Sequence, residues 1–234
     1  MKKWVQIVLP VMLFATVLYF CVFAVVFYQS EQTAALLGSG TTVVLDAGHG
    51  GEDGGATGVS GTSEAALNLE ISLRVRDLLR LCGVQVSMIR ETDTAVYSDG
   101  CRTIAEKKVS DIKNRASTVN QTEQPLLLSI HQNSMPQHPA VHGAQVFSNP
   151  QEPAAGLAQS IQQALNLTVN TGNEKTAKAI GDSVYLMKHI TCPGVLVECG
   201  FLSNSHEAQL LRQPEQQKRL VAAIVAGYLN FGNH

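Results

Sequence analysis

The sequence predicts a three-layer α/β/α domain with a mostly parallel sheet, preceded by an N-terminal transmembrane helix. Three observations support this prediction. Short apolar runs rich in β-branched residues alternate with stretches of helical periodicity, which is typical of parallel α/β folds. About 200 residues follow the first 28, enough for one compact domain. Those first residues contain an uncharged apolar run long enough to cross a bilayer.

The N-terminal residues 1–28 are predicted to form a transmembrane signal anchor. The run from Val5 to Tyr28 carries no charged side chain, and Lys2 and Lys3 precede it. Positive charge before a hydrophobic segment favours a cytoplasmic N-terminus, so the remainder of the chain is expected outside the cytoplasm. The protein is therefore expected to be anchored in the membrane.

Signal-peptide cleavage, which would make the protein secreted, is the alternative to an anchor. The apolar run is longer than a usual signal-peptide core, and no clear Ala-x-Ala site follows it, so the anchor is favoured. Residues 29–41, rich in Ser, Gln, Thr and Gly, are expected to be a short polar tether. The folded domain is expected to span residues 42–232.

Strands are predicted where apolar and β-branched residues cluster between turn residues. In chain order, the expected strands are Thr42–Asp46, Val84–Arg90, Leu126–His131, Gly143–Phe147, Ser183–Met187 and Gly194–Cys199.

Helices are predicted between these strands. Ser63 can cap a helix whose apolar residues recur at helical spacing from Leu67 to Cys82, and Gly83 is placed to end it. The further expected helices are Thr103–Asn120, Glu152–Leu165 and Pro214–Phe231.

Charge and cysteine content exclude several classes of protein. The formal net charge is −2 and the basic residues are dispersed, so nucleic acid is not expected as a partner. Five cysteines are present without a CxxC pair, which gives no sign of a structural zinc site or redox motif. Cys192 and Cys199 could approach each other across a strand, but two small buried apolar residues are favoured over a disulfide.

Two histidines and two glutamates stand at the ends or starts of predicted elements. His49 and His131 follow or end strands, Glu64 opens a helix, and Glu198 ends another strand. Parallel sheets gather their sites at the carboxyl ends of the strands, so these side chains are expected to converge there. Two imidazoles and one carboxylate can hold Zn²⁺ and leave a position for water, whose proton a second carboxylate can accept. The pattern predicts a metallohydrolase.

Simpler explanations exist for most of these residues. A single histidine is often a hydrogen-bonded structural residue, and a glutamate in a first helical turn commonly complements the helix dipole. Glu198 differs because it follows three apolar residues expected to be buried, where a carboxylate needs a metal, cation or proton to offset its charge. His189 is the best substitute ligand. Arg90 and Asp93 are expected to form an architectural ion pair.

The sequence around the four residues resembles the zinc-dependent N-acetylmuramoyl-L-alanine amidases of the Amidase_3 type, from Val43 to about Tyr228. The motifs that carry this resemblance are Asp46-Ala47-Gly48-His49-Gly50-Gly51, Glu64 with Asn68-Leu69, Ser129-Ile130-His131 with Asn133, and Pro193-Gly194-Val195-Leu196-Val197-Glu198-Cys199-Gly200.

The resemblance implies roles for particular residues. His49, Glu64 and His131 match the zinc ligands of the family, and Glu198 matches its catalytic glutamate. Asp46 and Asn133 match recurrent positions that support the ligands or contact the substrate. The implied cofactor is Zn²⁺ and the implied substrate is peptidoglycan, cleaved between N-acetylmuramic acid and L-alanine.

The short chain, N-terminal anchor and bare catalytic domain are most similar to the germination-specific, spore-cortex amidases. In that subgroup, removal of the stem peptide prepares muramic acid for muramic-δ-lactam formation. No wall-binding repeats follow the domain, so localisation is expected to depend on the membrane or on an activating protein partner. A zinc peptidase acting within the stem peptide and a non-catalytic wall-binding module are the alternatives.

Overall fold

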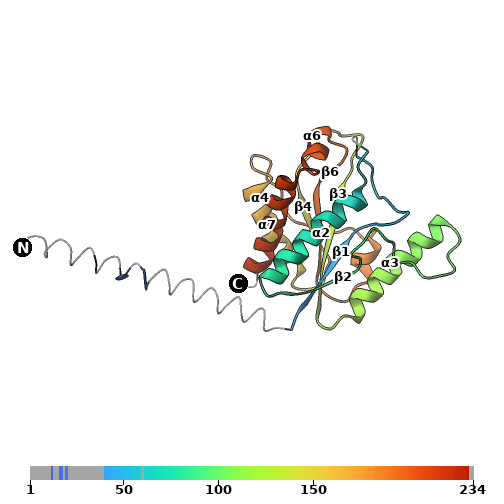
Figure 1. Ribbon diagram of the computed structural model, residues 1–234, viewed down its shortest axis with the longest axis horizontal. Coiled ribbons are helices and arrows are strands. Elements are labelled where there is room, and N and C mark those ends of the chain that lie inside the picture. Colours follow the sequence, from blue (N-terminus) through green and yellow to red (C-terminus); the bar gives the residue numbers. More distant parts are fainter. Residues whose placement is uncertain (1–11, 13–15, 18, 21–39, 59–60, 232–234) are drawn as a thin grey trace, which may run out of the picture.

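The computed structural model describes residues 12, 16–17, 19–20, 40–58 and 61–231 (Figure 1). The expected anchor and tether fall almost entirely outside these described residues. Within the described part of the chain, no helix has both the length and the apolar character needed to cross a membrane.

A six-stranded sheet forms the centre of the domain, in the order β2-β1-β3-β6-β4-β5. Strands β2, β1, β3 and β6 run parallel, and β4 is antiparallel to β6. The expected mostly parallel sheet is confirmed. The strands are β1 (Thr42–Ala47), β2 (Gln85–Met88), β3 (Pro125–Asn133), β4 (Gln145–Ser148), β5 (Lys178–Ala179) and β6 (Gly194–Phe201).

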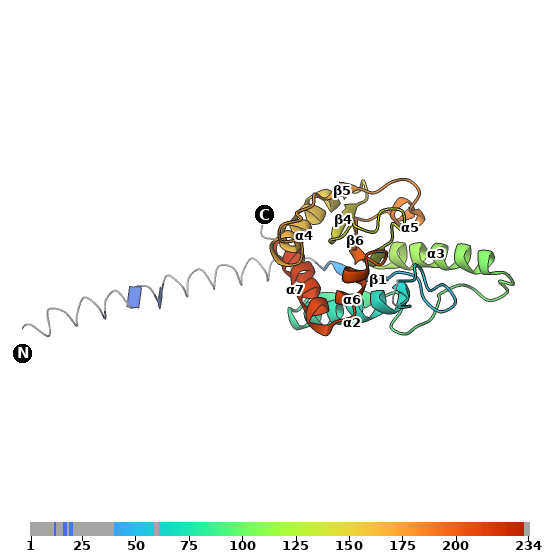
Figure 2. The same ribbon diagram turned by 90° about the horizontal axis from the view of Figure 1, so that it is seen from above.

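Helices cover both faces of the sheet and complete the three layers (Figure 2). Apolar residues of α2, α4 and α7 pack in one core, and those of α3 and α5 pack in the other. Neighbouring strand residues alternate between the cores: Val43 and Leu45 enter the first, and Val44 enters the second. The helices are α2 (Glu64–Leu81), α3 (Ile104–Gln121), α4 (Ala154–Thr168), α5 (Tyr185–His189), α6 (Ser205–Leu210) and α7 (Pro214–Phe231).

Helix α2 begins and ends where the sequence indicates. The Ser63 hydroxyl accepts a hydrogen bond from the backbone N–H of Ala66, which satisfies one of the free donors of the first turn. Gly83 follows the helix with a φ of 82°, a conformation that favours glycine. The N-cap fixes the position of Glu64, the first residue of α2.

One expected strand is wrong. The segment Ser183–Met187 contributes to the short helix α5, because Leu186, Met187 and Ile190 enter the second core from one side of a helical turn. A five-residue apolar run does not distinguish strand from helix by periodicity. The short elements β5 and α6 were not expected. The other predicted elements are confirmed, with small differences at their ends.

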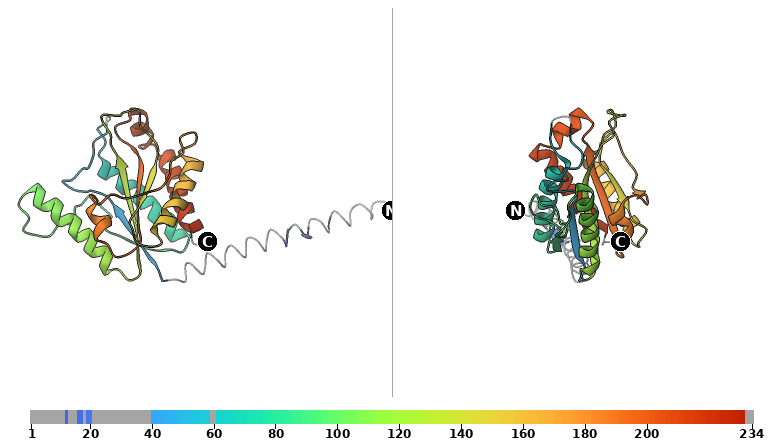
Figure 3. Two further views of the ribbon diagram at one scale, coloured as in Figure 1. Left: turned by 180° about the vertical axis from the view of Figure 1, so that it is seen from behind. Right: turned by 90° about the vertical axis from the view of Figure 1, so that its right-hand side faces the viewer.

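Among the described residues, the buried members of both cores lie between Val43 and Val225, and Phe231 packs against the first core, so the described chain from Gly40 onward packs as one domain. The described chain enters β1 and leaves α7 at the same end of the domain (Figure 3). Cys192 and Cys199 are buried and not joined, which confirms the expectation of two small apolar residues. The carboxyl ends of the parallel strands lie at the opposite end from the termini.

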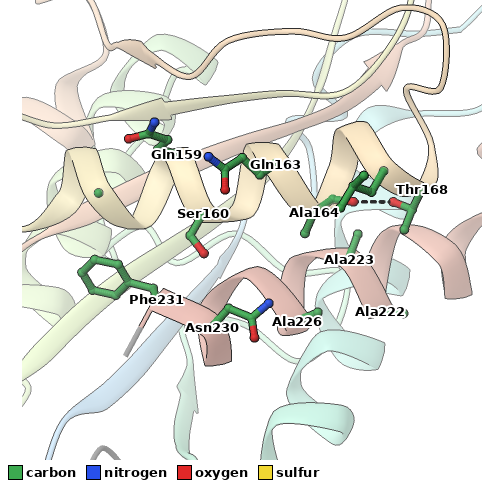
Figure 4. A pocket seen from close by; sticks show the side chains of 12 residues that line it. Gln159, Ser160, Gln163, Ala164, Thr168, Ala222, Ala223, Ala226, Asn230 and Phe231 are labelled. Carbon is green, nitrogen blue, oxygen red and sulfur yellow. Dashed lines mark hydrogen bonds between the residues drawn. The ribbon is translucent and has the colours of Figure 1, made fainter. Parts of the chain in front are cut away.

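A hollow of about 780 Å³ is lined by residues of α4 and α7 (Figure 4). The two helices approach closely because Gly227 has no Cβ, which would lie 2.4 Å from the Cα of Ile161. The Ser160 hydroxyl also donates to the Gly227 carbonyl. Of the described residues that line this hollow, none ionises, so it has no acid–base chemistry.

Candidate active site

Three adjacent strands and one helix start supply the four candidate residues. His49 follows β1, His131 lies near the end of β3, and Glu198 lies in β6. His131 and Glu198 are directly paired in the β3–β6 register, and Glu64 is the first residue of α2. The expected convergence at the carboxyl edge of the sheet therefore occurs.

Donor atoms of His49, Glu64 and His131 all lie within 4.8 Å of one another. His131 Nδ1 is 2.8 Å and His49 Nε2 is 3.3 Å from Oε1 of Glu64. The two imidazole rings meet edge to face, with centroids 5.1 Å apart. Two nitrogens and one carboxylate oxygen at this spacing fit a Zn²⁺ site that keeps a position for water or substrate.

Two glycines make room for these side chains. A Cβ on Gly48 would lie 2.2 Å from the His131 ring, and a Cβ on Gly55 would lie 2.6 Å from Oε2 of Glu64. Real Cβ atoms do not approach other atoms so closely. Any larger residue at these positions would displace a candidate ligand.

Backbone donors and one buried amide fix the Glu64 carboxylate. Oε2 accepts a hydrogen bond from the N–H of Ala56, and Oε1 accepts others from the N–H of Gln132 and from Asn68 Nδ2. Burial opposes ionisation, but the hydrogen bonds and charges of His131 and His49 outweigh it and lower the pKa of Glu64. Glu64 is therefore anionic at neutral pH, as a metal ligand would need to be.

Carboxylates on both sides hold His49. Its Nδ1 is 2.9 Å from Oδ2 of Asp53, whose other oxygen pairs with Lys108. Burial opposes a charged imidazole, but Glu64 and Asp53 raise the pKa of His49 to about 9. A carboxylate behind a histidine ring orients the ring and makes the opposite nitrogen a stronger ligand.

Glu198 is the unusual carboxylate of the site. Its Oε2 is fully buried and has no hydrogen-bond partner among the described residues. Burial raises the pKa of Glu198 from 4.5 to about 7, and the negative charge of Glu64 adds to this shift. A carboxylate that takes up and releases a proton near neutral pH is suited to general acid–base chemistry.

Glu198 shares a cavity of about 240 Å³ with His49 and His131. The lining is apolar at α5, whereas α3 contributes the charged residues Lys108, Asp111 and Arg115 as well as Ile112. The apolar wall residues are Ile112, Val184, Leu186, Met187 and Leu196. His49, His131 and Glu198 thus line a pocket that also has apolar side chains in its wall.

Asp46 and Asn133, the two supporting residues expected from the sequence, have different surroundings in the structure. Asp46 is buried next to the site, where Arg115 lies 2.5 Å from Oδ1 and the Ser129 hydroxyl donates to Oδ2. Burial opposes its ionisation, but the charge of Arg115 holds the pKa of Asp46 below its ordinary value. Asn133 instead accepts a hydrogen bond from the N–H of Ser134.

The contacts that Arg90 and Arg115 make beneath the site were not predicted from the sequence. Arg115 was not singled out in the sequence, yet it is buried against Asp46. The ion pair expected between Arg90 and Asp93 is not formed: Arg90 donates to backbone carbonyls, and Asp93 accepts from the N–H of Gly51. The signals in the sequence were apolar neighbours: Met88 and Ile89 precede Arg90, and Ile112, Ala116 and Val119 surround Arg115 at helical spacing.

His189 does not take part in the cluster. Its ring stacks on Tyr185 with centroids 3.7 Å apart, on an exposed turn of α5. The substitute-ligand hypothesis is therefore not supported by its position.

Two histidines and a carboxylate that could hold a metal ion lie beside the buried carboxylate of Glu198 on an α/β/α scaffold, an arrangement typical of metal-dependent hydrolases. Comparison with known proteins specifies the family. The family model described as N-acetylmuramoyl-L-alanine amidase matches residues 43–230. The chain belongs to this family.

Similar proteins span most of the same region. The germination-specific N-acetylmuramoyl-L-alanine amidase of Bacillus subtilis (strain 168) is 35% identical over 193 residues, covering 82% of this chain and 80% of that protein. The CwlD amidase of Clostridioides difficile, solved in complex with the GerS lipoprotein, is 35% identical with a TM-score of 0.77, covering 81% of this chain and 97% of that one. AmiC2 of Nostoc punctiforme has 28% identity, a TM-score of 0.66, and coverage of 83% and 98%.

Proposed function

We propose that this protein hydrolyses the amide that joins the lactyl group of N-acetylmuramic acid to L-alanine in peptidoglycan, with zinc as cofactor. The observation that carries the proposal is the convergence of His49, Glu64 and His131 beside the buried carboxylate of Glu198. Membership of the amidase family supports the choice of bond.

His49, Glu64 and His131 would hold the zinc ion. When bound, zinc lowers the pKa of water and polarises a carbonyl group, which is the chemistry needed to attack a stable amide. The protein prepares the site for a dication, because the anionic Glu64 lies between the two imidazoles and Asp53 orients His49.

Glu198 performs the proton transfers. In its ionised form it accepts a proton from the attacking water, and it then delivers that proton to the amine nitrogen of the departing L-alanine. Its raised pKa, about 7, makes both steps feasible near neutral pH. The apolar wall contributed by Leu186 and Met187 limits water on one side of the reacting groups.

Digestion of purified peptidoglycan tests the proposal. The zinc-loaded chain should release stem peptides with a new N-terminal L-alanine and leave unsubstituted muramic acid in the glycan, as read by mass analysis. Glu198→Gln is the matched control and should release almost none. New N-termini within the stem peptide would instead identify a zinc peptidase, and binding without any product would identify a wall-binding module.

We propose the spore cortex as the place of action. The germination-specific relative in Bacillus subtilis supports this assignment. In the proposed role, removal of the stem peptide by this enzyme prepares muramic acid for a separate deacetylase and muramic-δ-lactam formation. Expression of this chain in Bacillus subtilis lacking its germination-specific amidase should restore muramic-δ-lactam, and its continued absence would contradict the proposed role.

We also propose that residues 1–28 anchor the enzyme in the membrane, with the domain outside the cytoplasm, and that a protein partner activates it. The uncharged run from Val5 to Tyr28 supports the anchor. The complex of the Clostridioides difficile CwlD amidase with the GerS lipoprotein supports the idea of a partner.

A further inference from the structure

Two buried arginines bind three consecutive carbonyl groups in the loop that carries His49. Arg90 donates from Nε to the carbonyl of Ala47 (2.7 Å) and from Nη2 to that of Gly48 (3.0 Å). Arg115 donates from Nη1 to the carbonyl of Ala47 (3.0 Å) and from Nη2 to that of His49 (2.7 Å). We call Arg90 and Arg115 the arginine clamp.

Burying the two guanidinium groups of the clamp costs free energy of folding, which suggests that they are kept for a function. Arg90 is 3% exposed and Arg115 is 2% exposed. Arg115 has the carboxylates of Asp46 and Asp111 as partners, but Arg90 has no ion pair among the described residues and satisfies its donors on carbonyl groups. A buried cation held by neutral acceptors costs free energy that an apolar side chain would not.

The clamped loop has an unfavourable backbone conformation. His49 has a φ of 61°, in the left-handed region that is unfavourable for a non-glycine residue. Gly50 and Gly51 follow it with positive φ angles and give the chain many alternatives. Contacts outside the loop must therefore hold His49 in place. The guanidinium groups supply most of those to its carbonyl groups, and Asn68 Nδ2 adds one to the carbonyl of Gly48.

The same two side chains connect the segments that carry all three candidate ligands. Arg90 Nη2 also donates to the carbonyl of Ala65, the residue after Glu64, at 2.9 Å. Arg115 pairs with Asp46, which accepts from Ser129 on β3, two residues before His131. Each ligand-bearing segment is thus linked to the clamp within two residues of its ligand.

We propose that Arg90 and Arg115 are positioning residues that preorganise the zinc site by fixing the carbonyls of Ala47, Gly48 and His49. This inference rests on the proposed zinc-dependent function. Lysine keeps the charge but lacks the planar fork, so it cannot hold two carbonyls in the same directions. Loss of the fork should release the loop and weaken zinc binding before it unfolds the domain.

The test uses the chain from Gly40 onward with Arg90→Lys or Arg115→Lys. Zinc affinity is measured by competition with a fluorescent chelator, and hydrogen exchange of residues 47–51 is measured in the metal-free protein. Each variant should lose about 10- to 100-fold in zinc affinity, the range typical of groups that support ligands. Exchange of the loop amides should accelerate more than exchange in α7.

Leu165→Ala is the matched control, since Leu165 is fully buried in α4 and belongs to neither the site nor the clamp. It should lower the melting temperature while leaving zinc affinity and loop exchange unchanged. If it weakens zinc binding as much as the clamp variants do at equal loss of stability, the clamp is merely structural and the proposal is wrong.

Arg90→Lys keeps the test decisive if Arg115→Lys does not fold, because Arg90 is not part of the ion pairs with Asp46 and Asp111. A wild-type chain that binds no zinc would overturn the proposed function, and the loop exchange would then decide on the clamp alone.

Discussion

Replacing Glu198 by glutamine should abolish turnover and also stabilise the metal-free domain at alkaline pH. The carboxylate has a pKa of about 7 in the folded protein because it is buried, against 4.5 when it is not. One pH unit corresponds to about 1.4 kcal/mol. An ionised Glu198 therefore costs the folded state up to about 3 kcal/mol above pH 7, and glutamine removes this cost.

The sign of the pH dependence follows from the raised pKa. Between pH 4.5 and 7 the unfolded chain has already lost the Glu198 proton while the folded chain keeps it, so wild-type stability falls as pH rises through this window. The Gln variant has no such proton. Its stability relative to wild type should increase from pH 4.5 to pH 7 and then remain constant. The pH dependence of His49 is common to both proteins and largely cancels in the comparison.

Urea unfolding at four pH values between 5 and 8, with chelator present and circular dichroism as the signal, measures this difference. A free energy difference of 1 kcal/mol shifts the melting temperature of a domain of this size by about 2–4 °C. In a thermal scan at pH 8, the melting temperature of the Gln variant should therefore be higher by up to about 6–12 °C. Glu215→Gln is the control, because Glu215 is exposed and paired with Lys218, which lowers its pKa. A stability difference between Glu198→Gln and wild type that is the same at pH 5 and pH 8 would refute the reasoning.

Activity completes the test of Glu198. General acid–base groups contribute about 10²- to 10⁴-fold, and a group that serves both proton transfers should fall at the upper end. Zinc should reduce the stability advantage of the Gln variant, because a nearby cation favours the ionised carboxylate of the wild type. Near-normal hydrolysis by the variant would remove Glu198 from the mechanism.

The remaining predictions concern the metal and the membrane. Alanine in place of His49, Glu64 or His131 should lower zinc affinity more than about 100-fold in a chelator competition, because each removes a donor rather than its support; full affinity would exclude that residue. Gly48→Ala should also weaken zinc binding with unchanged circular dichroism, since its Cβ would overlap the His131 ring. Zinc at 100 times its Kd should add about 2.7 kcal/mol to the free energy of unfolding, so a melting temperature insensitive to EDTA would contradict zinc binding to the native state. The full chain should stay with membranes after salt and alkaline washing, and deletion of residues 1–30 should release active enzyme; a mature N-terminus between residues 29 and 38 would show secretion instead.

The sequence could predict the fold because its buried strands are marked by apolar runs that end abruptly at polar residues. His131 and Glu198 each follow such a run, and these boundaries placed them at the carboxyl edge where the structure brings them together. Their assignment as zinc ligand and catalytic glutamate remains a prediction. The segment Ser183–Met187 could not be assigned correctly, because its burial against α3 is set by tertiary packing.

Long-range polar contacts were beyond sequence reasoning. Arg115 lies 66 residues from His49 along the chain, and nothing local indicates that its guanidinium reaches the carbonyl of that residue. Asn133 was expected from its motif to support the site or contact the substrate; its Oδ1 accepts a hydrogen bond from the N–H of Ser134, and its role in the site remains a prediction. Periodicity indicates which side of an element is buried, but not the partner that a buried polar group finds there.

The two outer strands of the sheet have a consequence for association between copies of the domain. β5 is only two residues long and carries the exposed Lys178, and β2 is four residues long with the carbonyl of Val86 occupied by Arg80. Short edges that carry or contact cations are poor templates for strand addition by another chain. Association of copies of the domain by adding strands to either side of the sheet is therefore disfavoured.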